Sequence, residues 1–327
     1  MEKKKLLEIK NLTVKFPSGD RYVNAVNGVD LTIREGEVLG IVGESGCGKS
    51  VSLFSILQLL PPQAKIEGEI WFEGKNLLEL EGDELRKIRG KEISMIFQEP
   101  MTSLNPVFKV GNQIAEAICL HKGVGKKEAR EEALKLLKLV DVPDAEKRLD
   151  CYPYQLSGGL RQRVMIAMAL ACNPKILLAD EPTTALDVTI QAQILELMLR
   201  LQEEYGMSIA IVTHDMGVIA ECAQRINVFY FGRVVEEAET LELFDHPTHP
   251  YTEGLLGCIP SINLDQEKLN TIEGMIPNPV DPPAGCPFCS RCNYAQAICE
   301  QELPELTEVA PDHRVACHFA KKRYLNS

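Results

Sequence analysis

One short stretch constrains the fold of this chain more than any other part of the sequence. Residues 43–50 read GESGCGKS and fit the pattern G-x-x-x-x-G-K-[ST]. An apolar run at 38–42 comes before the stretch, and the segment 51–57 after it can continue as a helix until Pro61 and Pro62 end it. A buried strand, a glycine-rich turn and a helix in this order predict an α/β fold with the turn at the edge of a sheet.

The same stretch has the chemistry of an anion site. Its glycines allow successive backbone N–H groups to point into one concavity, where the following helix adds its dipole. Phosphate is the expected guest, with Lys49 reaching the β and γ phosphates of ATP and the Ser50 hydroxyl binding Mg²⁺. A glycine turn that binds nothing is the alternative for this motif taken alone. The expected nucleotide contacts are Gly43, Ser45, Gly46, Cys47, Gly48, Lys49, Ser50 and Val51. We call residues 43–50 the phosphate loop.

The composition limits the classes of function. The 327 residues are 45% hydrophobic and carry a formal net charge of −12. This balance is ordinary for a globular protein with a real core, and it lacks the basic footprint of a nucleic-acid-binding protein. The longest apolar candidate, 164–172, is well short of the roughly 20 residues that cross a bilayer, and the N-terminus has no apolar segment typical of a secretory signal. We expect a cytoplasmic protein that meets membranes only through partners.

Three segments predict an antiparallel sheet beside the nucleotide. Segments 7–16 and 25–33 alternate as strands do, and 66–74 is a third sheet segment. Phe16 is expected to stack on the adenine ring, because a nucleotide needs an apolar plate as well as phosphate ligands. Tyr22 is the rival for this role, and core packing is the plain alternative for Phe16.

Further along the chain, buried strands are followed directly by polar side chains. The strand at 93–97 leads to Gln98, the strand at 176–179 leads to Asp180 and Glu181, and the strand at 208–212 leads to His214. Ligands of open α/β sheets bind at the carboxyl ends of the strands, so these side chains are expected near the ATP phosphates. Segment 226–231 is expected to close the sheet.

Each of these polar residues has an expected role. Paired acids at the end of a buried strand are costly unless they hold a cation or do proton work. We assign Asp180 to Mg²⁺, directly or through water, and Glu181 to the role of base or positioning group for the hydrolytic water. Gln98 is expected to contact Mg²⁺ and the attacking water, and His214 the γ-phosphate. A helix cap and an ordinary packed or exposed histidine are the alternatives.

A second glycine element follows at 156–163, which reads LSGGLRQR and precedes a helical run at 164–171. Ser157 is a plausible helix cap, and Gly158 and Gly159 ahead of a helix make a second nest of N–H groups. The chain therefore has two anion-binding ends.

The segment from Met101 to about residue 154 has helical periodicity. The periodicity is clearest at 126–137, where Ala129, Ala133 and Leu137 fall on one face. We interpret this segment as an inserted helical subdomain, from about residue 100 to 155. A further long helix is expected at 188–205.

Together these motifs resemble the ATPase subunit of an ABC transporter. The resemblance covers positions 6 to about 240, and its motifs in chain order are the phosphate loop, Gln98, residues 156–159, Asp180 with Glu181, Ala185-Leu186-Asp187 and His214. It implies a sandwich dimer in which Ser157, Gly158 and Gly159 of one subunit close over ATP on the phosphate loop of the other. Leu160 departs from the family pattern, in which glutamine is common at this position.

The tail after residue 240 narrows the resemblance. Residues 241–244 read LELF, residues 246–252 read HPTHPYT, and a cysteine-rich stretch spans 285–317. These features resemble the ATP-binding subunits of bacterial dipeptide and oligopeptide importers, a group that also includes nickel importers. The resemblance implies two membrane permease subunits, a second ATPase subunit with a hetero-pair favoured over a homodimer, and indirectly an extracytoplasmic binding protein. His246 and His249 could hold a metal, but the prolines beside them favour a rigid docking turn.

Five of the eleven cysteines fall between positions 286 and 317, whereas the other six are dispersed. In a reducing compartment such a group indicates a soft metal rather than disulfides. Four thiolates suit zinc or an iron-sulfur cluster, and the spacing of Cys286, Cys289 and Cys292 imitates the bacterial ferredoxin run; free thiols are the third alternative. The importer family implies a [4Fe-4S] cluster on Cys286, Cys292, Cys299 and Cys317, with Cys289 in reserve. Its role is structural or redox-sensing, and the prolines at 277–283 predict an ordered loop without strands.

The sequence thus predicts an α/β P-loop NTPase (RecA-like) core sheet with a flanking antiparallel β subdomain, an inserted helical subdomain and a small irregular metal-binding C-terminal region. We expect a nucleotide-binding domain at 1–240 and a C-terminal extension at 241–327. The expected function is ATP hydrolysis at the cytoplasmic face of the membrane to drive uptake of di- or oligopeptides. The alternatives are nickel as cargo, a soluble ABC ATPase acting on nucleic acid or ribosomes, and a redox-sensing regulator whose ATPase is secondary. The coiled-coil insertion or second ATPase unit usual in such soluble ATPases is not seen in this sequence.

Overall fold

The computed structural model describes residues 3–99, 103–184, 186–258 and 272–325. They divide into two compact units: the first comprises 1–34, 38–78 and 212–327, and the second comprises 35–37 and 79–211. Met101, where the helical periodicity begins, and Ala185 lie outside the described residues. The phosphate loop therefore belongs to the first unit, whereas Gln98, Asp180 and Glu181 belong to the second.

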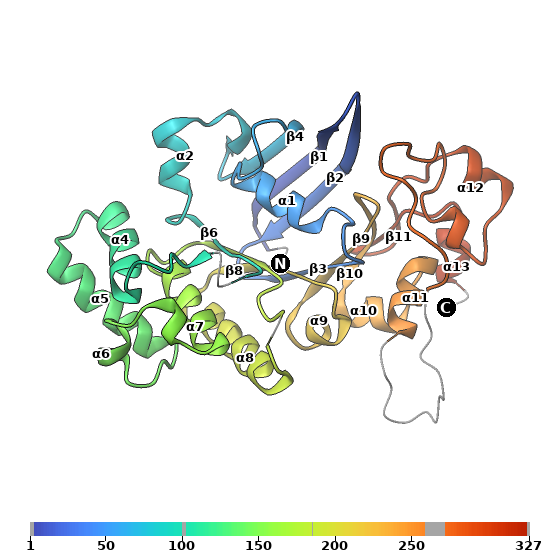
Figure 1. The fold of residues 1–327 in the computed structure, drawn as a ribbon. Coiled ribbons are helices and arrows are strands. Elements are labelled where there is room, and N and C mark those ends of the chain that lie inside the picture. The colour runs from blue at the N-terminus through green and yellow to red at the C-terminus, as the bar shows by residue number, and fades with distance from the viewer. Residues whose placement is uncertain (1–2, 100–102, 185, 259–271, 326–327) are drawn as a thin grey trace. The chain divides into compact units, whose positions relative to one another are not determined.

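The first unit contains the predicted antiparallel sheet. Its strands are β1 (Lys5–Ser18), β2 (Arg21–Arg34), β4 (Lys65–Phe72) and β5 (Lys75–Asn76), in the order β2-β1-β4-β5 (Figure 1). Leu12 and Val14 on β1 and Val26 on β2 are fully buried, as alternation in a sheet with one buried face requires. The prediction of three strands here is confirmed, and β1 and β2 extend further than expected toward their shared turn.

A second set of strands in this unit continues past residue 231, where the sheet was predicted to end. The strands are β3 (Val38–Val42), β9 (Arg225–Tyr230), β10 (Arg233–Glu239), β12 (His313–Val315) and β11 (Thr307–Ala310), in the order β11-β12-β10-β9-β3. The expectation that 226–231 closes the sheet is wrong. Phe231 and Gly232 both have positive φ, at 49° and 74°, and this tight turn lets the chain return as β10. The free edge of β10 then pairs with β12.

The helices of the first unit are α1 (Lys49–Ile56), α9 (Met216–Cys222), α10 (Thr240–Asp245), α11 (Pro250–Gly257), α12 (Ala297–Gln301) and α13 (Ala320–Tyr324). The described residues from 272 to 306 form no strand, as their prolines predicted. The C-terminal region as a whole is less irregular than expected, because α12 forms within this stretch and β11, β12 and α13 follow it.

The second unit has the predicted helical subdomain and three strands. Its helices are α2 (Gly82–Ile88), α4 (Val110–Lys122), α5 (Lys126–Leu139), α6 (Ala145–Arg148), α7 (Gly158–Ala169) and α8 (Val188–Tyr205). The strands β6 (Ile93–Ile96), β7 (Ile176–Asp180) and β8 (Ser208–Thr213), whose first part lies in this unit, are ordered β8-β7-β6. The strand predicted at 93–97 ends one residue earlier, because β6 stops at Ile96 and Phe97 is 36% exposed. Within the described ranges, no helix is long and apolar enough to cross a bilayer.

Candidate functional site

The phosphate loop has a shape that only glycine permits. Gly43 and Gly48 have φ values of 149° and 101°, which L side chains rarely adopt. A Cβ at Gly43 would lie 2.2 Å from the carbonyl oxygen of Phe229, and one at Gly48 would lie 2.4 Å from that of Ala25. The backbone is thus held close to its neighbours, and α1 begins at Lys49 immediately after the turn.

Lys49 lies across the phosphate loop. Its side chain is buried, and Nζ donates to the carbonyl oxygens of Gly43 at 2.7 Å and Glu44 at 2.9 Å. Burial raises the pKa of the neighbouring Cys47, so this residue stays a neutral thiol. An ammonium at the N-terminus of a helix, with a neutral thiol beside it, is an arrangement suited to a phosphate anion. Ser50 follows in the first turn of α1.

In the second unit, Gln98 and Glu181 are brought together. Gln98 Nε2 donates to Glu181 Oε2 at 2.8 Å, although 83 positions separate the two residues. Thr184 Oγ1 donates to the same oxygen at 2.8 Å. Asp180, at the end of β7, is 3% exposed. Glu181 has a φ of +45°, and a strained non-glycine backbone of this kind is typical of functional sites.

The sequence correctly predicted that Gln98 and Glu181 follow neighbouring strands at one edge of the sheet. It did not predict the hydrogen bond from Thr184 to Glu181. The signal was present, because Pro182 after two acids favours a turn, and the N–H of Thr184 returns to the carbonyl oxygen of Glu181 at 3.2 Å. Such a turn carries the hydroxyl back to the carboxylate. The carboxylate thereby receives two neutral donors that fix its direction.

His214, Phe16 and Tyr22, which are also expected near the nucleotide, lie in the first unit. His214 follows β8 and is exposed, and Asp215 caps α9 by accepting from the N–H of Gly217 at 2.8 Å. Phe16 is partly buried, whereas Tyr22 is exposed and has Lys65 Nζ 4.4 Å from its ring centroid. Lys49 and His214 thus belong to one unit and Glu181 to the other.

The second glycine element forms the N-terminus of α7. Ser157 is its cap, with Oγ accepting from the N–H of Leu160 at 3.4 Å. A Cβ at Gly159 would lie 2.8 Å from Cγ2 of Ile190 on α8, so glycine is required where these two helices meet. Ser157 and Gly158 are exposed, and their N–H groups and hydroxyl are accessible to another molecule.

The five clustered cysteines line one cavity of about 20 Å³, together with His249 and Phe288. Burial raises the pKa of Cys286 to about 11 and raises that of Cys292 and Cys317 as well, so these groups are neutral thiols at pH 7. In the described part of the chain, no set of three or more Cys, His, Asp or Glu side chains is arranged so that it could hold a metal ion. The donor chemistry of the five thiols suits a soft metal.

His249 of the HPTHPYT stretch is part of a packed turn. His249 is 2% exposed and caps α11, with Nδ1 accepting from the N–H of Tyr251 at 3.1 Å. Burial lowers the pKa of His249 to about 3, so the ring is neutral. The N–H groups of Thr248 and His249 both donate to the buried carboxylate of Glu236, at 2.7 and 3.0 Å. The turn is therefore packed against β10 of its own unit.

Comparison with known proteins agrees with this geometry. The family described as "ABC transporter" matches residues 26–184, and that described as "Oligopeptide/dipeptide transporter, C-terminal region" matches residues 235–299. A probable peptide ABC transporter ATP-binding protein of Sinorhizobium fredii is 50% identical over 95% of this chain and 94% of its own length. The dipeptide transport ATP-binding protein of Bacillus subtilis is 49% identical over 98% of this chain and 96% of its own length.

Solved structures give the same result for the fold. A dimeric ATP-binding cassette in a post-hydrolysis state with ADP and Pi has a TM-score of 0.65 and 36% identity, covering 72% of this chain and 98% of its own. The CbiO1 protein of Clostridium perfringens, part of an ABC transporter complex, has a TM-score of 0.62 and 28% identity, covering 75% and 92%. The resemblance inferred from the motifs is confirmed. The chain therefore belongs to the ATP-binding, ATP-hydrolysing proteins of ABC transporters, in the group that shares its C-terminal region with oligopeptide and dipeptide transporters.

Proposed function

We propose that this chain is the ATPase subunit of an importer of di- or oligopeptides, bound at the cytoplasmic face of the membrane to two permease subunits. The observation that carries the proposal is the near-full-length identity of about half to relatives named for peptide and dipeptide transport. The match in the C-terminal region supports the same cargo class. Nickel, carried by other importers of this type, is the competing cargo.

The ATP site uses the residues that the motifs predict. The phosphate loop and Lys49 bind the triphosphate, Phe16 packs on the adenine, and His214 contacts the γ-phosphate. Ser50, Gln98 and Asp180 would hold Mg²⁺, which supplies charge neutralisation for the phosphates. Glu181 orients the attacking water and accepts its proton, and the two hydrogen bonds from Gln98 and Thr184 support this role by aiming the carboxylate.

The working form is a dimer with a second ATPase subunit, and a related partner is favoured over a second copy. The exposed N-terminus of α7 supports this, since Ser157, Gly158 and Gly159 would close over ATP on the other subunit. The nucleotide-binding domain spans 1–240, with its helical subdomain at about 100–155, and the extension spans 241–327. Val107 and Phe108 in the helical part are 70% and 53% exposed, which supports a permease contact there.

The extension holds a soft metal on Cys286, Cys292, Cys299 and Cys317, as a [4Fe-4S] cluster or alternatively zinc. The convergence of the thiols on one cavity supports this assignment. The site requires the thiols to draw together and lose their protons on binding. Anaerobic purification followed by iron, sulfide and zinc analysis decides between the two metals, and absence of all three would leave free thiols.

Replacement of Glu181 tests the hydrolytic part of the proposal. Glu181→Gln should bind MgATP normally while hydrolysis falls by about 100-fold or more, as expected when a catalytic base is lost. Glu196→Gln, an exposed position on α8, is the matched control and should hydrolyse ATP like the wild type. Normal hydrolysis by Glu181→Gln would remove that carboxylate from the mechanism.

The cargo is tested in membrane vesicles that hold the complete transporter. ATP-dependent uptake of a labelled dipeptide or short oligopeptide, with no uptake of labelled Ni²⁺, is the expected result. The reverse pattern would make nickel the cargo and refute peptide import.

A further inference from the structure

Glu44, the residue at the first x position of the pattern G-x-x-x-x-G-K-[ST], is held at three points. Its carbonyl oxygen accepts from Lys49 Nζ at 2.9 Å, and its N–H donates to the hydroxyl of Tyr251 at 2.8 Å. Its carboxylate receives two hydrogen bonds from Arg291, Nη1 to Oε2 at 2.7 Å and Nη2 to Oε1 at 2.9 Å. Two of the three partners come from the extension after residue 240, 207 and 247 positions away along the chain.

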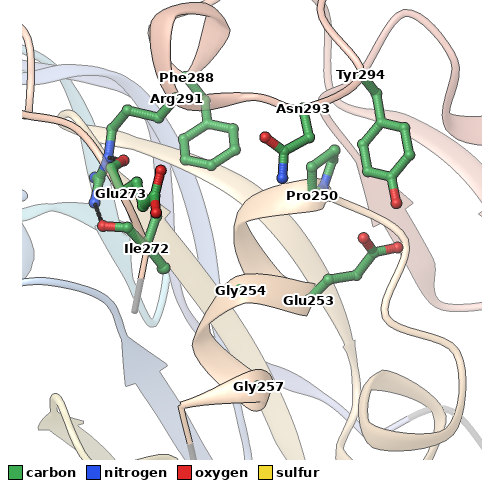
Figure 2. Close-up of a pocket in the computed structure, with 10 residues that line it drawn as sticks. All are labelled: Pro250, Glu253, Gly254, Gly257, Ile272, Glu273, Phe288, Arg291, Asn293 and Tyr294. Atoms are coloured by element: carbon green, nitrogen blue, oxygen red, sulfur yellow. Dashed lines mark hydrogen bonds between the residues drawn. The ribbon is translucent and has the colours of Figure 1, made fainter. Parts of the chain in front are cut away.

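Arg291 is itself firmly placed. Its side chain is only 3% exposed, compared with 28% for that of Glu44. Nε donates to the carbonyl oxygen of Glu273 at 3.1 Å, and Nη2 also donates to that of Ile272 at 3.1 Å. Figure 2 shows the guanidinium turned toward these two residues, at one side of a pocket of about 450 Å³. The planar fork therefore presents one N–H group of Nη1 and one of Nη2 to Glu44 in a fixed direction, and Nη1 also lies 3.5 Å from the hydroxyl of Tyr230.

The second holding point depends on an aromatic cluster. Tyr251 is fully buried, and its ring centroid lies 4.7 Å from that of Tyr230 and 5.5 Å from that of Phe288. Phe288 and Arg291 both belong to residues 286–292, which we call the cysteine segment. This segment, with Cys286, Cys289 and Cys292, thus supplies both the ring that packs on Tyr251 and the cation that binds Glu44.

Electrostatics gives these contacts a consequence for ATP. The triphosphate brings several negative charges to a loop that already carries the carboxylate of Glu44. Without a counter-charge, that carboxylate would repel the ligand at short range. The guanidinium of Arg291 cancels the charge and turns the carboxylate toward the extension. An arginine side chain is not deprotonated in proteins, so this cation is permanent.

We propose that Arg291 is a positioning residue for ATP binding, which neutralises and orients Glu44 and thereby makes the ATP affinity of the phosphate loop depend on the fold of the cysteine segment. The proposal rests on the ATP site of the proposed function but adds a regulatory input to it. The effect of Arg291 on the nucleotide passes through Glu44.

A double-mutant cycle on the full chain tests the proposal, with MgATP affinity measured by equilibrium dialysis. Arg291→Gln should weaken binding by about tenfold or more, because it leaves a carboxylate without its charged partner. In the Glu44→Gln background, which lacks the charge that Arg291 neutralises, adding Arg291→Gln should change the affinity by less than about twofold. Equal weakening by Arg291→Gln in both backgrounds, or no weakening, would overturn the proposal.

Two further variants separate positioning from folding. Arg291→Lys keeps the charge but loses the fork, so it should raise KM for ATP and leave kcat unchanged, whereas a folding defect would lower both kcat and the ATP affinity.

Arg21→Gln is the matched control, because it removes an exposed ion pair between Arg21 and Asp281 that ties the same extension to the β1–β2 turn. It should bind MgATP normally. A wild-type chain that fails to bind MgATP would refute the proposed function itself, not this coupling.

Discussion

The phosphate loop and the cysteine segment lie in contact, yet their conformations have different origins. The loop is shaped locally, by glycines whose Cβ atoms would collide with Phe229 and Ala25. The cysteine segment has only a short 3-10 turn at 289–291, and its side chains are held by residues elsewhere in the unit, Glu44 and Tyr251. A shape set by local backbone sterics is readable from a motif, whereas a shape set by partners far along the chain is not.

The largest effect is expected where the loop's local geometry is broken. Gly48→Ala should abolish measurable ATP binding and lower the free energy of unfolding by about 3 kcal/mol, because its Cβ meets the carbonyl oxygen of Ala25 and its φ is unsuited to alanine. Gly46→Ala is the control for φ alone, since nothing lies within 4 Å of its added Cβ, and should cost about 1 kcal/mol. Denaturant unfolding measures both, and equal losses would argue against local steric control.

The second prediction concerns the contacts that hold the extension. His313 is fully buried on β12 and bonds Glu236 at 2.9 Å and Glu242 at 3.2 Å. His313→Gln should lower the free energy of unfolding by about 2 kcal/mol at pH 6, because the buried carboxylate of Glu236 and the partly exposed one of Glu242 lose a charged partner. Thermal unfolding followed by circular dichroism measures this loss.

The same histidine gives a pH dependence with a definite sign. Burial lowers the pKa of His313, but the hydrogen bonds to Glu236 and Glu242 outweigh it and raise the pKa overall. The stabilisation is therefore complete below the unfolded value of about 6.5 and is lost as pH rises through the folded value. The difference between wild type and His313→Gln should shrink from pH 6 to pH 9. A difference that grows with pH would mean that the ring is neutral in the folded state.

The contrast also explains what the sequence could predict. The strands of the core and the meeting of Gln98 with Glu181 follow from apolar runs that end at one sheet edge. Thr184 required attention to a turn that follows Pro182. Arg291 and Tyr251 had no signal at all, since their partner Glu44 is more than 200 positions away. The extension of the sheet by β10, β12 and β11 was missed for the same reason. Whether such a segment forms a strand depends on the strand edge with which it pairs, and that edge cannot be read from the segment itself.

A third prediction sharpens the link between the two regions. Cys286→Ser should disturb the cysteine segment and weaken MgATP binding by roughly fivefold, less than the loss of Arg291 itself. In the background that carries both Arg291→Gln and Glu44→Gln, the same change should have no effect. Cys119→Ser, a dispersed cysteine on α4, is the control. Equal weakening in both backgrounds would show that Cys286 acts on ATP by a route other than Arg291.

The smallest effect is expected at Thr184, which compares a local and a distant partner of one carboxylate. Thr184→Val removes one hydrogen bond to Glu181 while keeping the shape of the side chain, so kcat should fall by about threefold with KM unchanged. Thr184→Ser keeps the hydroxyl and should hydrolyse ATP at close to the wild-type rate. If Thr184→Ser is as slow as Thr184→Val, the methyl group matters rather than the hydrogen bond. Gln98→Leu, which removes the distant partner 83 positions away, should reduce kcat at least as much, because Gln98 is also proposed to contact the metal and the water.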